Sequence, residues 1–372
     1  MKYNLADICE YAKGKVDVAI LDEDTYISTE NMMPDKGGIT SAASLPTVAQ
    51  TQAFIAGDIL VSNIRPYFKK IWFAEFDGGC SNDVLVFRAK DGVSKRFLYY
   101  VLANDTFFDY SMATSKGTKM PRGDKVAIMK YNIPDFTYEK QEKISGILDV
   151  LDRKIQLNTE INENLEQQAQ ALYHHMFVKN ASSEWKEGTL SDIADITMGQ
   201  SPSGSSYNEN GEGTIFFQGR AEFGFRFPSI RLYTTEPKRM AYANDVLMSV
   251  RAPVGDLNVA HTDCCIGRGL AAIHSKIGQQ SFVLYTMFAL KNQLNVFNGE
   301  GTVFGSINRN SLNNMSIVIP SPDLISAFED IVTPIDAAIR NNYDEICSLT
   351  QLRDSILPKL MSGELDISDI NL

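Results

Sequence analysis

One segment of the sequence gathers arginine and glutamine side chains, which can form paired hydrogen bonds with a planar partner. Segment 218–231 places them between aromatic residues, beginning Gln-Gly-Arg-Ala-Glu-Phe-Gly-Phe-Arg-Phe. Arginine can form two parallel hydrogen bonds with guanine, and glutamine can do the same with adenine. The candidates from this segment and the residues after it are Gln218, Arg220, Arg226, Arg231, Lys238 and Arg239. The simpler interpretation of any single cation is a solvated surface residue, so the prediction rests on the whole pattern.

The first half of the chain holds a second group of cations, on segments that suit contacts with phosphates. These candidates are Arg65, Lys69, Lys70, Lys116, Lys119, Arg122 and Lys125. The last four lie in one glycine-containing loop, 116–125. The counterpart of this loop in the second half, 301–309, offers backbone amides and Arg309. Amides and cations position a protein on DNA by binding phosphates, and the recurrence of the loop favours that role.

Motifs for catalysis and for cofactor binding are missing from the sequence. It has no Pro-Pro, which methyltransferases of exocyclic amino groups use, no Walker A loop, and no complete GxGxxG fingerprint. The five cysteines form no CxxC pair and there is no HExxH, so we expect reduced cytosolic thiols rather than a disulfide framework or structural zinc. We predict no catalytic residue, no metal and no cofactor in this chain, and a cytoplasmic location.

The elements that must position these residues occur twice along the chain. The segment Gly57–Ser62 with Pro66 returns as Asn244–Ser249 with Pro253, at an offset of 187 residues. This period is too long for a solenoid repeat of roughly 20–50 residues. It indicates two copies of a whole domain, each followed by a helical tail. Two similar but diverged domains suit a protein that holds two similar but different targets at a fixed spacing.

The two helical tails carry a heptad pattern in the same register. In residues 143–176, apolar and asparagine side chains recur at alternating steps of four and three, and the pattern returns 184 residues later. Thr137 and Ser321 are candidate N-caps. The predicted pairing residues are Leu151, Ile155, Asn158, Leu165, Ile335, Ile339, Asn342, Ile346 and Leu349. We expect the two helices to pack as an antiparallel rod; the alternative is that each helix covers its own domain.

Two features of the helical tails allow sharper predictions. Pro334 should break or kink the second helix and Pro358 should end it, which leaves a main helix of about 22 residues, or about 33 Å. Domains separated by such a rod would lie about one DNA turn apart, roughly 34 Å. Asn158 and Asn342 lie near the middle of their helices, and we expect their side chains to meet and fix the register.

These patterns predict an α+β fold in which two similar mixed domains are separated by two long antiparallel helices, with a pseudo-twofold internal repeat. Strands are expected near 58–64, 71–75, 83–88, 215–218, 245–250 and 270–274, and helices near 96–109 and 280–297. The predicted boundaries are 1–137 for the first domain, 138–181 for the central helical spacer, 182–320 for the second domain, and 321–372 for the C-terminal helical spacer that pairs with 138–181.

Charge and hydropathy permit DNA binding without indicating it. The formal net charge is −11, but residues 321–372 alone hold 10 acidic and 3 basic residues. The two large domains are each close to neutral. Phosphate binding needs a local basic face rather than a positive total. The apolar runs are too short for a membrane span, so no membrane partner is expected.

Four segments, in order and spacing, resemble one known family. They are Gln141-Glu-Lys-Ile-Ser-Gly-Ile-Leu-Asp149, Asp245-Val-Leu-Met-Ser-Val-Arg-Ala-Pro-Val-Gly-Asp256, Cys265-Ile-Gly-Arg-Gly-Leu-Ala-Ala272, and Leu352-Arg-Asp-Ser-Ile-Leu-Pro-Lys-Leu-Met-Ser-Gly-Glu-Leu365. Over essentially its whole length, the chain resembles the specificity subunits of type I restriction–modification systems. Arg251 of the Arg-x-Pro triplet joins the DNA-binding candidates. The first domain departs from the pattern, because it has Arg65-Pro66 and no Gly-Arg-Gly.

The resemblance implies that each large domain is a target recognition domain that reads one half of a bipartite, asymmetric site in double-stranded DNA. The helices would set the spacer between the half-sites and bind modification subunits, of which two are expected. Those partners would hold S-adenosylmethionine and methylate adenine at N6, so this chain would be non-catalytic. A motor and nuclease subunit could add restriction, a defence against foreign DNA. The acidic segment 321–372 then suits a protein partner, since it would repel DNA.

Two other classes of function stay open on the sequence alone. A DNA-independent scaffold would join two protein partners through its domains, and its binding would be insensitive to salt, whereas phosphate contacts weaken steeply as salt rises. An enzyme with an unrecognised site would turn over a substrate as the isolated chain.

Overall fold

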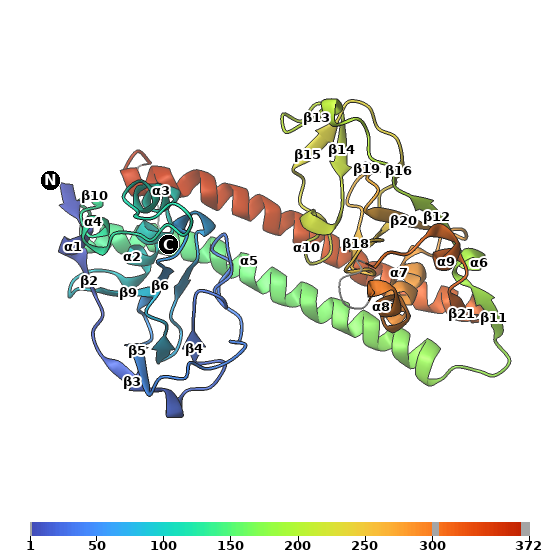
Figure 1. Cartoon of the computed structure of the whole chain (residues 1–372), viewed down its shortest axis with the longest axis horizontal. Coiled ribbons are helices and arrows are strands. Elements are labelled where there is room, and N and C mark those ends of the chain that lie inside the picture. The colour runs from blue at the N-terminus through green and yellow to red at the C-terminus, as the bar shows by residue number, and fades with distance from the viewer. Residues whose placement is uncertain (1, 300–304, 366–372) are drawn as a thin grey trace. The chain divides into compact units, whose positions relative to one another are not determined.

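The computed structural model describes residues 2–299 and 305–365 and has a mixed α+β fold (Figure 1). The chain divides into two compact units: unit 1 is Met1–Asn158 with Asp344–Leu372, and unit 2 is Thr159–Tyr343. Each unit has sheets of its own and a segment of both long helices, α5 (Tyr138–Tyr173) and α10 (Pro322–Ser362). The units therefore do not coincide with the halves of the sequence, because each long helix begins in one unit and ends in the other.

The main sheet of unit 1 is antiparallel, in the order β2-β9-β6-β7. Its strands are β2 (Cys9–Tyr11), β6 (Ile59–Ser62), β7 (Ile71–Phe73) and β9 (Val84–Ala89). Successive side chains of a strand point to opposite faces of the sheet. In β6, Ile59 and Val61 join the core beneath the helices, whereas Leu60 joins the core beneath a second sheet. Burial on both faces explains why this strand is a continuous apolar run.

Two helices and the second sheet cover these faces. Helices α2 (Lys95–Ala103) and α3 (Asp105–Ala113) bury Phe97 and Phe107 in the first core. The second sheet, of order β3-β5-β8-β4, contributes Phe54 and Ile27 to the other core. The remaining elements are β1 (Lys2–Asn4), which pairs with β10 (Asn132–Pro134), and β3 (Lys15–Asp17), β4 (Tyr26–Ile27), β5 (Gln50–Phe54), β8 (Gly78–Cys80), α1 (Leu5–Ile8), α4 (Lys125–Ile128), η1 (Val18–Ile20) and η2 (Pro66–Phe68).

Unit 2 repeats this architecture, with a main sheet of order β12-β20-β17-β18 and a second sheet of order β13-β15-β14-β19-β16. Its strands are β11 (Lys186–Thr189), which pairs with β21 (Ser316–Ile319), and β12 (Ala194–Met198), β13 (Tyr207–Asn208), β14 (Thr214–Phe217), β15 (Leu232–Thr234), β16 (Met240–Ala241), β17 (Val246–Ser249), β18 (Leu257–Val259), β19 (Cys264–Ile266) and β20 (Leu270–Ser275). Its short helices are α6 (Leu190–Ile193), α7 (Gln280–Ala289), α8 (Lys291–Asn295), α9 (Arg309–Asn313), η3 (His174–Lys179), η4 (Gly204–Ser206), η5 (Arg220–Glu222) and η6 (Val296–Asn298). The six predicted strands agree with β6, β7, β9, β14, β17 and β20 to within one residue where they begin.

The long helices begin where the sequence predicts. The side chain of Thr137 accepts the amide of Lys140 at 3.4 Å, as an N-cap does. The Ser321 carbonyl accepts the amides of Leu324 and Ile325, and Pro322 occupies the first helical position, where a missing N–H costs nothing. The predicted seam is turned inward, since Ile144, Leu148, Ala169, Phe328, Val332 and Ile339 have no exposed surface.

The prediction that Pro334 and Pro358 would interrupt the second helix is wrong. Helix α10 runs without a break through 41 residues, from Pro322 to Ser362. A proline in a helix removes one hydrogen bond and costs about 3 kcal/mol. Both prolines are exposed, and buried neighbours such as Val332 and Leu357 hold the helix against the protein on either side of them. Tertiary packing here outweighs the local preference.

Within each unit the two helix segments run antiparallel. In unit 1, Arg353 bonds with Asp152 and Glu345 with Asn158, so the order along one helix is reversed along the other. In unit 2, Asn342 donates to Asn162 at 2.9 Å, and Asn162 donates to the carbonyl of Ile339. The approach of the Asn158 and Asn342 side chains stays a prediction, and the bonds that the structure describes run to other residues. Asn342 bonds with a residue one turn beyond Asn158, and Asn158 bonds with Glu345.

Candidate nucleic-acid interface

Three loops of unit 2 are brought together by glycines. The amide of Gly267 donates to the carbonyl of Phe217 at 2.8 Å, and the amide of Gln200 donates to Ile266 at 3.0 Å. A Cβ atom on Gly199 would lie 2.2 Å from the Gly267 carbonyl oxygen, so no other residue fits there without moving the backbone. Loops 199–201, 217–219 and 267–269 therefore form one continuous edge.

This edge carries three exposed side chains that can form hydrogen bonds with bases. They belong to Gln200, Gln218 and Arg268. The amide of Arg268 donates to the Ser201 hydroxyl at 3.2 Å, which fixes the tip of its loop. Our sequence interpretation chose Gln218 but missed Gln200 and Arg268. The available signal was a cation held between two glycines, Gly267 and Gly269.

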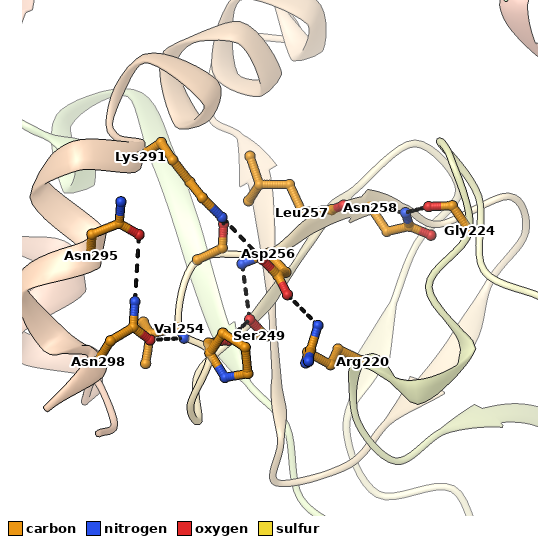
Figure 2. Close-up of polar contacts among 12 residues, drawn as sticks. Arg220, Gly224, Ser249, Val254, Asp256, Leu257, Asn258, Lys291, Asn295 and Asn298 are labelled. Atoms are coloured by element: carbon orange, nitrogen blue, oxygen red, sulfur yellow. Dashed lines mark hydrogen bonds and ion pairs between the residues drawn. The ribbon is translucent and has the colours of Figure 1, made fainter. Parts of the chain in front are cut away.

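A tight turn, 249–256, continues the edge (Figure 2). The Ser249 hydroxyl donates to the carbonyl of Pro253 at 2.6 Å and accepts the amide of Asp256 at 3.0 Å. The amide of Val254 donates to the side chain of Asn298. These bonds close the turn and join it to the segment after α8.

Asp256 fixes this turn to its neighbours through charge. Its carboxylate contacts Arg220 at 2.5 Å and Lys291 at 3.0 Å, and Figure 2 shows it between the two cations. Asp256 is partly buried, with 29% of its side chain exposed, whereas Arg220 and Lys291 are each about half exposed. Arg220, a predicted DNA contact, therefore has a structural partner and still offers part of its guanidinium to solvent.

The turn also presents Arg251 and connects it to the rest of the edge. Arg251 is exposed and forms a backbone bridge with Ser306. The amide of Val250 donates to the Gly269 carbonyl at 3.0 Å, and the amide of Ile307 donates to Val250. We call the five loops 199–201, 217–219, 250–252, 267–269 and 305–309 the reading edge of unit 2. Arg309, the first residue of α9, is exposed. Residues 301–304 of the predicted loop lie outside the described residues.

Unit 1 builds the same backbone connections with different side chains. The amide of Asn63 donates to Asp83 at 2.8 Å, as Val250 does to Gly269. Ile64 forms a backbone bridge with Arg122, as Arg251 does with Ser306. By this correspondence Ile64 occupies the place of Arg251, and Asn82, next to Asp83, occupies that of Arg268. The first candidate interface thus shares a framework with the second and differs in the groups that it offers.

An unusual turn follows in unit 1. Arg65 and Lys69, at the two ends of η2, have φ angles of 50° and 49°, which side chains other than glycine rarely adopt. The turn leaves Tyr67 and Phe68 exposed by 49% and 38%. Such rings can stack on bases or pack on sugars, although single exposed aromatic residues are also common on ordinary surfaces. Arg65 is half-buried, and its amide donates to Pro121.

Several predicted cations of both units already have partners. Lys69 contacts Asp105 at 2.8 Å, and this hydrogen bond raises the pKa of Lys69. Lys116 contacts Asp124 at 2.6 Å, and together with the amides of Ala127 and Val126 it lowers the pKa of Asp124 to about 2. The other engaged cations are Lys70 (with the Thr29 carbonyl), Arg122 (with Asp83) and Arg231 (with Glu222). The further exposed cations among the candidates are Lys119, Lys125, Lys238 and Arg239.

The structure contradicts the assignment of Arg226 as a DNA contact. Only 4% of this residue is exposed, and its guanidinium lies 3.0 Å from Glu166 and 3.3 Å from Asp336. A buried guanidinium needs such partners, because an unpaired charge is costly away from water. Arg226 therefore has a structural place, although it lies on the segment that carries Gln218 and Arg220.

The comparisons with known proteins bear on this pair of interfaces. The family model for the type I restriction modification DNA specificity domain matches residues 1–167 and 182–342. This chain belongs to that family. Two matched segments of similar length agree with the repeated architecture. The chain is therefore a DNA specificity component of a type I restriction–modification system.

Relatives in the type I specificity family span most of this chain. It is 29% identical over 340 residues to the putative type I restriction enzyme MjaX specificity subunit of Methanocaldococcus jannaschii, with 84% of this chain and 79% of that protein covered. It is 24% identical over 457 aligned residues to the type I restriction enzyme HindI specificity subunit of Haemophilus influenzae, with 98% and 99% covered. The crystal structure of a type I S subunit from M. genitalium has the same fold, with a TM-score of 0.59, 16% identity, and 99% and 96% covered.

Two further observations concern membrane-spanning helices and metal sites. Across residues 2–299 and 305–365, no helix is both long and apolar enough to cross a bilayer. Within the same part of the chain, no cluster of three or more histidine, cysteine, aspartate or glutamate side chains is placed to hold a metal ion.

Proposed function

We propose that this chain recognises a bipartite, asymmetric DNA site and directs methylation of adenine N6 by a partner modification subunit. Unit 1 would read one half-site and unit 2 the other. The observation that carries this proposal is the reading edge, whose backbone framework is built in both units while its side chains differ. A shared framework suits a shared docking geometry on the duplex, and different side chains suit different bases.

The side chains at equivalent positions support different half-sites. In unit 2, Arg251 and Arg268 are exposed cations of the kind that form bidentate bonds with guanine. In unit 1 the corresponding places hold Ile64 and Asn82, an apolar residue and an amide. An amide can pair with adenine, and an aliphatic side chain can contact the thymine methyl group. The two units would therefore favour different base compositions.

The chemistry would come from partners. Two modification subunits would bind S-adenosylmethionine and carry out the transfer, and a motor and nuclease subunit could add restriction. This chain would act without a cofactor and without catalytic residues of its own. The segment of α10 within 321–362 is rich in carboxylates and would repel DNA, which suits a surface that binds protein.

The proposal is tested by single-molecule sequencing of genomic DNA from cells with and without this gene, in the presence of its cognate modification subunit. We expect N6-methyladenine at one split motif only when the gene is present. Absence of any such motif, with the complex shown to assemble, would overturn the proposal and favour a scaffold that joins proteins without reading DNA.

A further inference from the structure

Arg226 connects the middle of a DNA-facing loop to three helices of unit 2. Segment 218–231, which we call the anchored loop, carries exposed candidates on both sides of it. The Nε atom of Arg226 lies 3.0 Å from Glu166 of α5, and its second guanidinium nitrogen lies 3.3 Å from Asp336 of α10. The third nitrogen donates to the hydroxyl of Tyr285, on α7, at 3.1 Å. We call these four residues the Arg226 cluster.

The backbone near Arg226 is fastened to the main sheet as well. The carbonyl of Arg226 accepts the amide of Val259, the last residue of β18, at 2.8 Å. Two residues earlier, the carbonyl of Gly224 accepts the side-chain amide of Asn258 at 2.9 Å. The anchored loop is therefore held by the sheet edge through its backbone and by the long helices through the side chains of Arg226 and Phe227.

A cavity of about 320 Å³ lies beside this anchor. Its walls include Phe227 from the anchored loop, Val259 and Leu284 from the domain, and Ala337 from α10. The contact between the loop and the helices is therefore not a continuous apolar interface. The ring of Phe227 lies 4.8 Å from that of Tyr343 on α10, and the ion pairs of Arg226 add a polar connection beside the cavity.

Unit 1 fills the equivalent positions with large side chains. Counting from Tyr100 and Tyr285, which occupy the same place in α2 and α7, Tyr99 corresponds to Leu284 and Arg96 to Ser281. The Arg96 guanidinium lies 3.9 Å from the centre of the Phe73 ring and 3.5 Å from Asp149 of α5. The cation that reaches α5 thus comes from the covering helix α2 in unit 1, whereas in unit 2 the buried guanidinium of the anchored loop reaches α5 and α10 beside a cavity.

We propose that the Arg226 cluster is a positioning device that holds the anchored loop on the long helices and thereby makes the protein discriminate between spacer lengths. This inference rests on the proposed function. Adding one base pair between two half-sites moves the second by about 3.4 Å and turns it by about 35°. A loop clamped to the helices cannot follow such a shift. A loop that can move into the cavity can follow this shift, but its position relative to the helices is then less well defined.

The test uses the full chain in complex with its cognate modification subunit. Its DNA substrates carry both half-sites, found from wild-type methylation, with the spacer lengthened or shortened by one or two base pairs. The main variant is the double substitution Arg226→Met with Glu166→Gln. Removing only the arginine would leave Glu166 buried and unpaired, whereas replacing both charges with groups of similar size is often tolerated.

We expect the double variant to keep both half-site sequences and to lose discrimination between spacers. Its preference for the wild-type spacer over one base pair more or less should fall by about tenfold, or about 1.4 kcal/mol of discrimination. Arg226→Lys, which keeps the charge and one contact, should lie between the variant and the wild type. Retention of full spacer discrimination in a double variant that unfolds at the wild-type temperature would overturn the inference.

Arg353→Met is the matched control. Arg353 is also a largely buried arginine that contacts aspartates, Asp152 and Asp354, but these residues all lie on the long helices. Loss of the Arg353 guanidinium should lower the stability of the chain and leave the preference for the wild-type spacer unchanged. If Arg353→Met reduced that preference as much as the double variant does, spacer discrimination would depend on the helices rather than on the anchored loop. If the double variant fails to fold, Asp336→Asn gives a second route to the same measurement. A wild-type complex that shows no split site would instead reject the proposed function.

Discussion

The hydroxyl of Tyr285 donates a 2.9 Å hydrogen bond to Asp336, and the equivalent hydroxyl of Tyr100 donates a 2.8 Å bond to Asp152. Both tyrosines are almost fully buried, and each lies on the helix that covers the main sheet of its unit, α7 or α2. Each bond joins that helix to a long helix. The repeat has therefore kept this connection, while the arginine beside it comes from the anchored loop in unit 2 and from α10 in unit 1.

Replacing either tyrosine by phenylalanine should weaken the attachment of its domain to the long helix. Each of the changes Tyr285→Phe and Tyr100→Phe should cost about 1.5–3 kcal/mol, because a hydrogen bond to a charged group is lost in a buried place. Calorimetric unfolding of the full chain measures the loss. Tyr207→Phe, whose hydroxyl donates to a carbonyl in a loop, is the control and should cost less. Equal effects of all three changes would contradict the role that we assign to the repeated pair.

Loss of Arg268 should relax one position of a single half-site. Arg268→Ala should cost about 1–3 kcal/mol at that position if the side chain forms a bidentate contact with a base. The half-site read by unit 1 should be unchanged. Methylation of a randomised site library measures both halves at once. Lys276→Ala is the control, since Lys276 follows the opposite end of β20 and bonds with the Ser191 carbonyl. Weakening of every sequence alike would reassign Arg268 to a phosphate.

Lys119 and Lys125 should act on all sequences equally. Both are exposed cations of the loop 116–125 and of the helix after it, which suits contacts with phosphates. Each of Lys119→Ala and Lys125→Ala should reduce the slope of log affinity against log salt by about 1, without any change in the recognised motif. Fluorescence anisotropy at several salt concentrations gives the slope. A changed motif with an unchanged slope would place these residues on bases instead.

The asparagine pair of unit 2 should be sensitive to the loss of one partner. Asn162→Ala removes the acceptor of Asn342 and the donor to the Ile339 carbonyl, so it should cost about 1–3 kcal/mol. The double change Asn162→Leu with Asn342→Leu should cost less, since an apolar pair leaves one polar group fewer unpaired. Thermal unfolding compares them. A double variant less stable than Asn162→Ala would indicate that the helices need this polar contact to pack at all.

The thiols should differ in reactivity. Burial raises the pKa of Cys9, Cys80 and Cys264 to about 12, so at pH 8 almost none of each is the reactive thiolate. Cys265 is buried too, and Cys347, on α10, is only partly buried. A maleimide at pH 8 should therefore label one thiol in the folded chain, and Cys347→Ser should abolish the labelling. Rapid labelling of two or more sites, read by mass spectrometry, would contradict the burial of the others.

The sequence by itself determined the repeat, the start of both long helices, the inward seam and the main strands. These features follow from local rules: period two in strands, heptad spacing in helices, an N-cap at Thr137, and a proline at the first helical position, Pro322. It also predicted the family, because the order and spacing of several segments can be read from the sequence without knowing which of them are close in space. The choice of loops that could contact DNA rests on glycine and cation content, which is a local property, and it stays a prediction.

Only the tertiary structure decided which side chains those loops expose. Arg226 and Arg220 look alike in the sequence, but one is buried between Glu166 and Asp336, and the other remains half exposed beside Asp256. The partners are distant in the chain, so no local pattern contains them. The same holds for Pro334, which α10 tolerates because packing on both sides outweighs one lost hydrogen bond. It holds too for the partner of Asn342, because the register of two helices is set by how their whole faces pack.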